Sequence, residues 1–328
     1  MSAYIIRRVA AGIVILFVAS FLIYILVAES GDPLASLRAN PHVTQATITA
    51  AKARLGLDHP LLDRYWLWLT HFVQGDFGKS TNGQPVGPQL WQRLGVTLKL
   101  VIPATLIAVV LGIGLGVLGA VRQYKPVDHI STGLAYIFYA TPVFVLGILL
   151  KDFFAIKVNT AVGHTVLYTI GDSTPDFSGG AGSRLLDDIE HTALPVLTLV
   201  LVTYASWSRY QRASLLDVLN SDYVRFARAK GLSRRRVLIR HALRNALIPI
   251  TTVIALDFAV VIGGTVITEI VYGWEGMGKF LLNGLTGPLT PDVNTVQAWL
   301  VIIAALVVFF NLLADILYGV LDPRIRYG

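Results

Sequence analysis

Two short motifs have the residue types of nucleotide-binding loops. The stretch GKS at 78–80 looks like the end of a phosphate-binding loop. That motif needs a glycine five positions before Gly78, and Val73 stands there. The stretch GLGVLG at 114–119 matches a dinucleotide fingerprint, which requires a strand before it and a helix after it. It lies instead inside an apolar run, where small residues let membrane helices approach closely. We therefore predict helix packing, not nucleotide binding.

Acid–base, nucleophilic and metal chemistry has little support in the sequence. The chain has no cysteine, which excludes disulfides, thiolate nucleophiles and cysteine-based metal sites. The seven histidines are scattered, and none has a partner at a metal-ligand spacing such as HExxH. No hydrolase triad or carboxylate pair stands out. The sequence predicts neither an enzyme nor a metal site.

Two carboxylates, Asp257 and Glu269, interrupt a long apolar run. Carboxylates inside a membrane often mark proton relays, so a proton-coupled secondary transporter is one alternative. Glu269 lies near the end of the run and can instead be simply hydrated. Asp257 lies near the middle, and helical steps of three and four place it on one stripe with Gly264 and Thr268. That stripe can line a pathway or hydrogen-bond to a second subunit, and both interpretations remain open.

The composition indicates a membrane protein. Of 328 residues, 54% are hydrophobic, and only 14% are charged, against about 25% in a typical soluble domain. The mean hydropathy is +0.63. The net charge of +7 could suggest nucleic acid, but in a membrane protein such an excess marks cytoplasmic loops.

Six apolar runs are candidates for membrane spans, since a bilayer core needs about 20 residues per helix. The first is longer than the 7–15-residue apolar core of a signal peptide, which favours a retained span over a cleaved leader. We expect an all-α membrane protein with segments 1–28 (first span), 29–99 (a small extracytoplasmic helical cap) and 100–328 (a five-helix core). The runs are Val9–Ala28, Leu100–Val121, Ile130–Leu150, Thr192–Ser208, Ala246–Ile270 and Val293–Ala314.

Basic residues predict the orientation, because cytoplasmic loops carry the excess of Lys and Arg. Ten basic residues and two acidic residues lie in 209–244, whereas 156–193 has two basic and five acidic residues. We expect a multi-pass protein of the bacterial cytoplasmic membrane with both termini inside. The other basic pairs on the predicted inner side are Arg7 with Arg8, Arg122 with Lys125, and Arg324 with Arg326.

The cap is predicted to contain two helices, at 42–55 and 61–73. The second is amphipathic and carries Trp66 and Trp68. These tryptophans can lie at the membrane interface, where such rings are enriched. They can equally pack on the cap's own aromatic residues.

Residues 222–249 read DYVRFARAKGLSRRRVLIRHALRNALIP. Ser221 or Asp222 can cap a helix over 223–230, and Gly231 can end it. Ser233 can cap a second helix over 234–245, and Pro249 is expected where the chain re-enters the bilayer. One interpretation is a basic helix held by anionic lipid. The small residues at 227 and 229 instead favour a low-profile surface that fits a groove on another protein.

This segment resembles the EAA loop of permease subunits of ABC importers, through Ala227-Arg228-Ala229-Lys230-Gly231 and Leu247-Ile248-Pro249. The chain further resembles the B-type permease of dipeptide and oligopeptide importers nearly from end to end. Departures are Phe226, Glu275 and the stretch 285–294, and relatives of that family carry nickel or other small solutes. The motifs that carry the resemblance are Gly31-Asp32-Pro33, Leu55-Gly56-Leu57-Asp58, Gly75-Asp76-Phe77-Gly78, Asp128-His129, Pro142, Phe144, Thr268-Glu269, Trp274, Gly276, Gly278, Asn311-Leu312-Leu313-x-Asp315 and Asp322-Pro323-Arg324-Ile325-Arg326.

The resemblance implies a type I ABC importer permease fold that forms half of a translocation pathway. The implied partners are a second homologous permease, two ATPase domains (separate or fused), an extracytoplasmic substrate-binding protein and membrane lipid, with no nucleic acid. ATP and Mg²⁺ would belong to the partner subunits, with no cofactor in this chain. Residues 122–129 would make a lesser contact with an ATPase.

The resemblance, together with the stripe of Asp257, Gly264 and Thr268, gives three sets of site residues. The ATPase-docking coupling helix would contain Asp222, Tyr223, Arg225, Ala227, Arg228, Ala229, Lys230 and Gly231; the cargo pathway or gate would contain Pro142, Phe144, Asp257, Gly264, Thr268 and Glu269; and the outer loop facing the binding protein would contain Trp274, Gly276 and Gly278.

Overall fold

The computed structural model describes residues 2–30, 34, 38, 42–54, 57–175, 177–286 and 291–321. Within these residues the fold is helical, and the only β-type pairing is an isolated bridge between Lys79 and Pro85. The expected all-α class is confirmed for this part of the chain. The motif residues at 31–33, 55–56 and 322–326 lie outside it.

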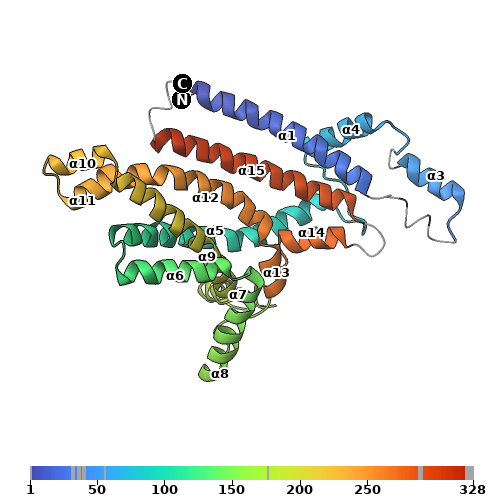
Figure 1. Cartoon of the computed structure of the whole chain (residues 1–328). Helices are drawn as coiled ribbons and strands as arrows, with labels where there is room; N and C mark the ends of the chain where they lie inside the picture. Colours follow the sequence, from blue (N-terminus) through green and yellow to red (C-terminus); the bar gives the residue numbers. More distant parts are fainter. Residues whose placement is uncertain are drawn as a thin grey trace.

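Long helices that run alongside one another form the body of the molecule (Figure 1). The tightest pair is α5 (Val86–Val121) with α9 (Ala181–Leu219). Helix α12 packs against both α9 and α15, and α1 packs on α15. The bounds of these three helices are Ser2–Ser30 for α1, Arg244–Gly264 for α12 and Val293–Leu321 for α15.

Two glycines of the apparent dinucleotide motif, Gly116 and Gly119, lie in the contact between α5 and α9, as does Gly112 just before the motif. A β-carbon placed on Gly116 would come within 2.6 Å of the carbonyl oxygen of Ser208. One placed on Gly112 would come within 2.9 Å of the β-carbon of Trp207. Only glycine allows the two helices to approach this closely. The predicted packing role is confirmed.

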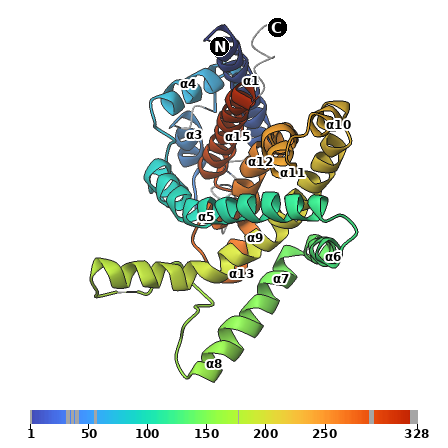
Figure 2. The same ribbon diagram turned by 90° about the vertical axis from the view of Figure 1, so that its left-hand side faces the viewer.

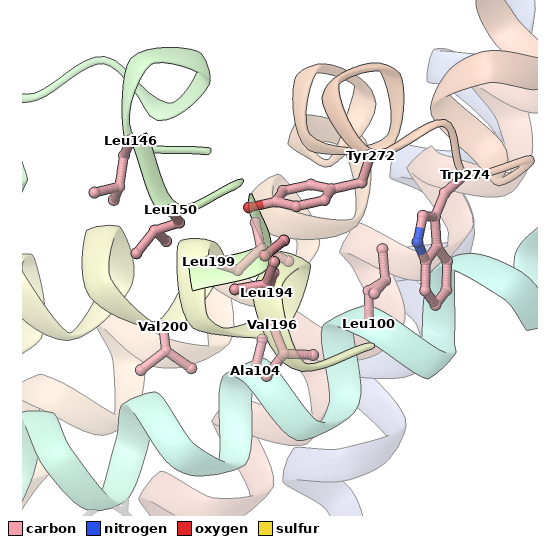
Figure 3. Close-up of a cluster of buried hydrophobic side chains, with 11 residues drawn as sticks. Leu100, Ala104, Leu146, Leu150, Leu194, Val196, Leu199, Val200, Tyr272 and Trp274 are labelled. Carbon is pink, nitrogen blue, oxygen red and sulfur yellow. The ribbon is translucent and has the colours of Figure 1, made fainter. Parts of the chain in front are cut away.

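One apolar core joins α5 and α9 to α7 (Val143–Leu150) (Figure 3). Leucine and valine side chains of α9 fill the space between α5 and that helix, and Tyr272 and Trp274 close one end. The buried residues that the figure labels are Leu100, Ala104, Leu146, Leu150, Leu194, Val196, Leu199, Val200, Tyr272 and Trp274.

The predicted span 130–150 is not one straight helix. It is split into α6 (Pro126–Ala140) and α7 (Val143–Leu150), and the helical run Val143–Val162 that α7 begins is bent by 107° from α6. Thr141 has an extended backbone, as expected for a residue before a proline, and Pro142 begins the new helix. Helix α7 continues into η1 (Lys151–Val158) and α8 (Asn159–Val162), an arm that leaves the bundle in both views (Figures 1 and 2).

Two further predicted spans differ from the helices that contain them. The predicted span 192–208 is the middle of the 39-residue helix α9, and Pro195 lies inside this helix. The predicted span 246–270 breaks at Thr265 between α12 and α13 (Val266–Tyr272). An apolar run shows where a bilayer can lie, and a helix often extends past it.

Within the described residues, four helices are long and apolar enough to cross a membrane, or five if the bent pair is one span. Helix α9 is not among them. It packs against α5, α6, α7 and α12, so neighbouring helices cover much of its surface.

The segment predicted to form a cap contains the two expected helices, α3 (Gln45–Arg54) and α4 (Leu61–Val73). Tyr65 of α4 is buried among Phe17, Phe21 and Tyr24 of α1, with ring centroids 5.0–6.0 Å away. Trp68 joins this aromatic cluster, 5.5 Å from Tyr24. Trp66 keeps 53% of its surface exposed. Trp68 therefore packs on aromatic residues, and the exposed Trp66 leaves the predicted place at the membrane interface open.

Candidate functional site

The basic segment after α9 forms an elbow at one end of the bundle (Figure 1). Its first arm is α10 (Asp222–Ala229), within one residue of the predicted helix. Gly231 has a φ of +78°, and its amide donates to the Arg228 carbonyl at 2.9 Å. The next amide, of Leu232, donates to the Ala227 carbonyl at 3.4 Å. This pair of bonds is a Schellman turn, so the predicted glycine stop is confirmed.

Helix α10 has a buried face and an exposed face. Val224 and Ala227 pack into an apolar cluster with Leu215 of α9 and Val237. Ala227 is 6% exposed, so its predicted place on a free docking surface was wrong. It instead lets α10 lie close to the bundle. The exposed residues are Asp222, Tyr223, Arg225, Phe226, Arg228, Ala229 and Lys230.

The second arm of the elbow is continuous with the next membrane helix. It runs from α11 (Arg234–Arg236) through the π-helical η2 (Val237–Leu243) directly into α12. Pro249 therefore lies inside a continuous helix. The side-chain amide of Asn245 donates to the Tyr223 hydroxyl at 2.9 Å and links the second arm to the first.

The 122–129 segment lies beside this elbow. Asp128 is buried and accepts two hydrogen bonds from the Arg212 guanidinium of α9, at 2.7 and 2.8 Å. Arg234 of the elbow donates to the Val121 carbonyl at 3.4 Å. The elbow and this segment thus form one surface at one end of the bundle, as the expected joint contact requires.

At the opposite end, Glu269 is a fully buried carboxylate. One oxygen accepts from the hydroxyls of Thr97 at 2.6 Å and Thr265 at 3.2 Å. The other accepts from the backbone amides of Gly278 at 2.8 Å and Lys279 at 3.2 Å. Those amides begin α14 (Met277–Leu285), so Glu269 caps a helix from a distance. The expectation of a hydrated Glu269 was wrong.

The loop between α13 and α14, predicted to face outward, closes over this carboxylate. Trp274 is 1% exposed and its amide donates to the Glu269 carbonyl at 2.8 Å. A β-carbon on Gly276 would lie 2.3 Å from the Glu269 carboxylate, and one on Gly278 would lie 2.3 Å from the α-carbon of Val266. Trp274, Gly276 and Gly278, which were predicted to face the binding protein, are buried within the chain and offer no surface to a binding protein. Close packing explains why glycine stands at positions 276 and 278.

Sequence reasoning missed Thr97, whose hydroxyl donates to Glu269 and accepts from the Met277 amide at 2.8 Å. It also missed the exposed part of the loop. Arg93 reaches Glu275 at 2.6 Å, and Lys279 pairs with the same carboxylate. Burial alone would raise the pKa of Glu275, but the hydrogen bonds from Lys279 and Arg93 outweigh it and the pKa is lowered. Thr97 and Glu269 are 172 residues apart, and Arg93 and Glu275 are 182 residues apart, so no local sequence pattern could predict these two contacts.

A second polar cluster, also missed, holds the 168–174 loop on α9. His191 is 3% exposed, stacks on Tyr168 with centroids 3.9 Å apart, and contacts the Gly171 carbonyl at 3.1 Å. Asp187 accepts from the Thr174 amide at 3.0 Å, and although burial opposes the charged form, the bonds from Thr174 lower the pKa of Asp187. Within the described residues, no three His, Asp or Glu side chains are placed to hold a metal ion.

The predicted pathway residues do not form one group. Asp257 is partly buried and accepts from the Trp207 indole N–H at 2.7 Å. Gly264 ends α12, and Thr265 follows it outside either helix, so the predicted helical stripe from Asp257 to Thr268 is interrupted. Thr268 is buried, and its hydroxyl has no hydrogen-bond partner among the described residues. Among the other two, Pro142 lies at the bend, and Phe144 beyond it is 47% exposed.

Comparison with known proteins settles the family. Residues 97–327 match the family described as binding-protein-dependent transport system inner membrane component, and residues 1–100 match the N-terminal family of such components. The chain belongs to this family of inner membrane components.

Relatives of this membrane component match over its whole length. It is 44% identical over 327 residues to the oligopeptide transport system permease protein OppB of Mycobacterium tuberculosis, covering 99% of each chain. It is 34% identical over 329 residues to the glutathione transport system permease protein GsiC of Escherichia coli, covering all of each chain.

The fold has a solved counterpart. A chain of the inward-facing MetNI methionine ABC transporter superposes with a TM-score of 0.52 at 16% identity. The match covers 71% of this chain and 96% of that one. At this identity the likeness concerns the fold alone, and it agrees with the expected permease architecture.

Proposed function

We propose that this chain is the permease subunit of an ATP-driven ABC importer and forms half of a translocation pathway for di- and oligopeptides. The full-length similarity to permease proteins of oligopeptide and glutathione systems supports peptide cargo. The observation that carries the ATP-driven mechanism is the elbow. Its first helix is fixed by a glycine turn on one side and presents a basic, exposed face on the other.

The elbow suits the transmission of movement. Its second arm runs without interruption into α12, so a push on α10 reaches the membrane helices through a rigid connection. The bond between Asn245 and Tyr223 makes the two arms move together. We infer that two ATPase domains, separate or fused, dock here and hydrolyse ATP with Mg²⁺, and that 122–129 adds a lesser contact.

Six spans, both termini in the cytoplasm and a bacterial inner-membrane location complete the proposal. The middle of α9, residues 192–208, is free of charge and would be the fourth span. A homologous permease would supply the other half of the pathway, and a binding protein would deliver cargo to the end opposite the elbow. Asp257, Gly264, Thr268, Pro142 and Phe144 remain the proposed pathway and gate residues.

Uptake measurements test the proposal. The chain is co-expressed with its partner subunits, reconstituted in liposomes with enclosed ATP, and supplied with a labelled peptide on its binding protein. We expect uptake that requires ATP, stops with vanadate and is unaffected by a protonophore. Uptake driven by a pH gradient without ATP would identify a secondary transporter. Competition by Ni²⁺ but not by peptides would reassign the cargo.

A further inference from the structure

Helix α4 has three distinct sides. Tyr65 and Trp68 face the aromatic cluster on α1. Asp63, Leu67 and His71 face a cavity of about 1040 Å³, which the 76–83 loop and the start of α15 also line. The third side is an apolar stripe, called here the α4 stripe, at intervals of four, three and four residues: Leu62, Trp66, Leu69 and Val73.

The α4 stripe is exposed over most of its length. Leu62 is 57% exposed, Trp66 53% and Val73 78%. None of its four residues is charged or carries a carboxylate, amide or hydroxyl group. A helix side of this composition is unfavourable in water, because each exposed leucine or tryptophan forgoes the free energy of burial. Something apolar must therefore cover it.

The α4 stripe continues onto the surface of α1. The rings of Trp66 and Phe17 lie 5.8 Å apart, and Phe17 is itself 43% exposed. The neighbouring Ile13, Val14 and Val18 of α1 are also exposed and apolar, as expected for a membrane-spanning helix. The two helices share one continuous apolar surface.

The depth of this contact identifies the environment. Phe17 lies eleven residues before Ala28, where the apolar run of α1 ends. At 1.5 Å per residue, the contact is about 17 Å inside that end, well within a hydrocarbon core of about 30 Å. Helix α4 is therefore at the level of the bilayer and not above it.

We propose that α4 lies within the lipid leaflet at the end opposite the elbow, with the α4 stripe against acyl chains. Its polar side then borders the cavity, which keeps Asp63 and His71 out of hydrocarbon. Leu62, Trp66 and Val73 contact lipid in the assembled transporter. This inference rests on the packing of α4 on α1 and not on the proposed cargo or energy source.

Spin-label accessibility tests the proposal, and the absence of native cysteine makes single labels specific. Leu62→Cys and Val73→Cys place labels on the α4 stripe, and Asp63→Cys and His71→Cys are matched controls on the polar side of the same helix. Each variant is assembled with cysteine-free partner subunits in phospholipid nanodiscs. Collision with oxygen, which enriches in lipid, is compared with collision with a water-soluble nickel chelate.

We expect oxygen to dominate at 62 and 73 and the nickel chelate to dominate at 63 and 71, so that the ratio inverts between the two sides. Dominance of the chelate at 62 and 73 would place α4 in water. Low accessibility to both reagents there would mean that a protein subunit covers the α4 stripe. Either result overturns the proposal.

Tryptophan fluorescence gives an independent test without a label. In nanodiscs of lipids brominated on the acyl chains, Trp66→Phe should remove a quenched component of the emission, because phenylalanine keeps an aromatic ring and changes the packing little. Trp68→Phe is the matched control inside the aromatic cluster and should remove an unquenched component. An unchanged quenched fraction in Trp66→Phe would contradict contact with lipid.

Discussion

Glu269 shows how a single buried carboxylate can organise the end of the molecule opposite the elbow. Its two oxygens accept four hydrogen bonds, from two threonine hydroxyls and from two amides at the start of α14. An ionised carboxylate only accepts hydrogen bonds, and all four partners here donate. A proton relay would require the group to exchange protons, which would break this set. The contacts favour a structural role.

Glu269→Gln should therefore destabilise the protein. The glutamine NH₂ group would face donors in place of an acceptor, and leaving buried groups unsatisfied costs about 1–3 kcal/mol. We expect a lower thermal midpoint for the purified complex. Glu275→Gln is the matched control, because that carboxylate is 43% exposed and its ion pairs contribute about 0–1 kcal/mol. A Glu269→Gln protein of normal stability that lost only proton-driven uptake would support the relay instead.

Asp257 has an identified partner, the indole N–H of Trp207 at 2.7 Å. Asp257→Asn keeps an oxygen that can accept this bond and removes the charge. If the carboxylate lines the pathway and attracts the amino end of a peptide, free-amine peptides should be transported more slowly and N-acetylated peptides nearly normally. Uptake of both cargoes, delivered by the same binding protein, measures this difference.

Trp207→Phe is the companion variant to Asp257→Asn, because it removes the donor and keeps the charge. We expect it to leave the preference between free and acetylated peptides intact. Equal slowing of both cargoes by Asp257→Asn, or loss of complex assembly, would point to a structural role for Asp257.

At the scale of elements, the elbow depends on one backbone conformation. Gly231 has a φ of +78°, and no atom lies within 4 Å of where its β-carbon would be. The preference for glycine is therefore conformational and not steric. The turn directs the chain from α10 into the arm that becomes α12, so its geometry sets the angle at which α10 is presented.

Gly231→Val should uncouple ATP hydrolysis from transport in the proposed importer. A branched residue in the left-handed region costs about 1–2 kcal/mol, which would loosen the turn and not unfold the bundle. We expect normal assembly, with loss of transport and of ATPase stimulation by loaded binding protein. Gly231→Asn is the matched control, because asparagine tolerates this conformation, and it should retain most activity. Normal transport by Gly231→Val would refute the docking role of the elbow.

The elements differ in how far the sequence predicts them. Helix α10 and its glycine stop depend on neighbouring residues, so the sequence predicted both within a residue. The glycines between α5 and α9 were interpreted correctly because close helix packing has a local signature. The break at Thr265 and the network of Glu269 were not predicted. Thr97 lies 172 residues from Glu269, and only the tertiary fold brings them together.

At the scale of the whole molecule, charge is sorted along the bundle axis. The basic segments that follow α5 and α9 meet at the elbow end, through Arg212 with Asp128 and Arg234 with Val121. Arg8 near the start of α1 pairs with Asp315 near the end of α15 at 3.1 Å. The acidic loop before α9 belongs to the other end, where Gly171 bonds to Tyr272. This separation is what the positive-inside rule requires of a membrane protein.

Single cysteines test the orientation of the chain, which has none of its own. Ser233 and Asn245 lie in the elbow and Ser178 in the loop before α9, and all three are exposed. An impermeant thiol reagent should label 178 in intact cells and label 233 and 245 only after the inner face is opened. The physical reason is the ten basic residues of 209–244, since segments rich in Lys and Arg are retained on the cytoplasmic side. Labelling of 233 in intact cells would reverse the orientation and place the elbow beyond the reach of any cytoplasmic ATPase.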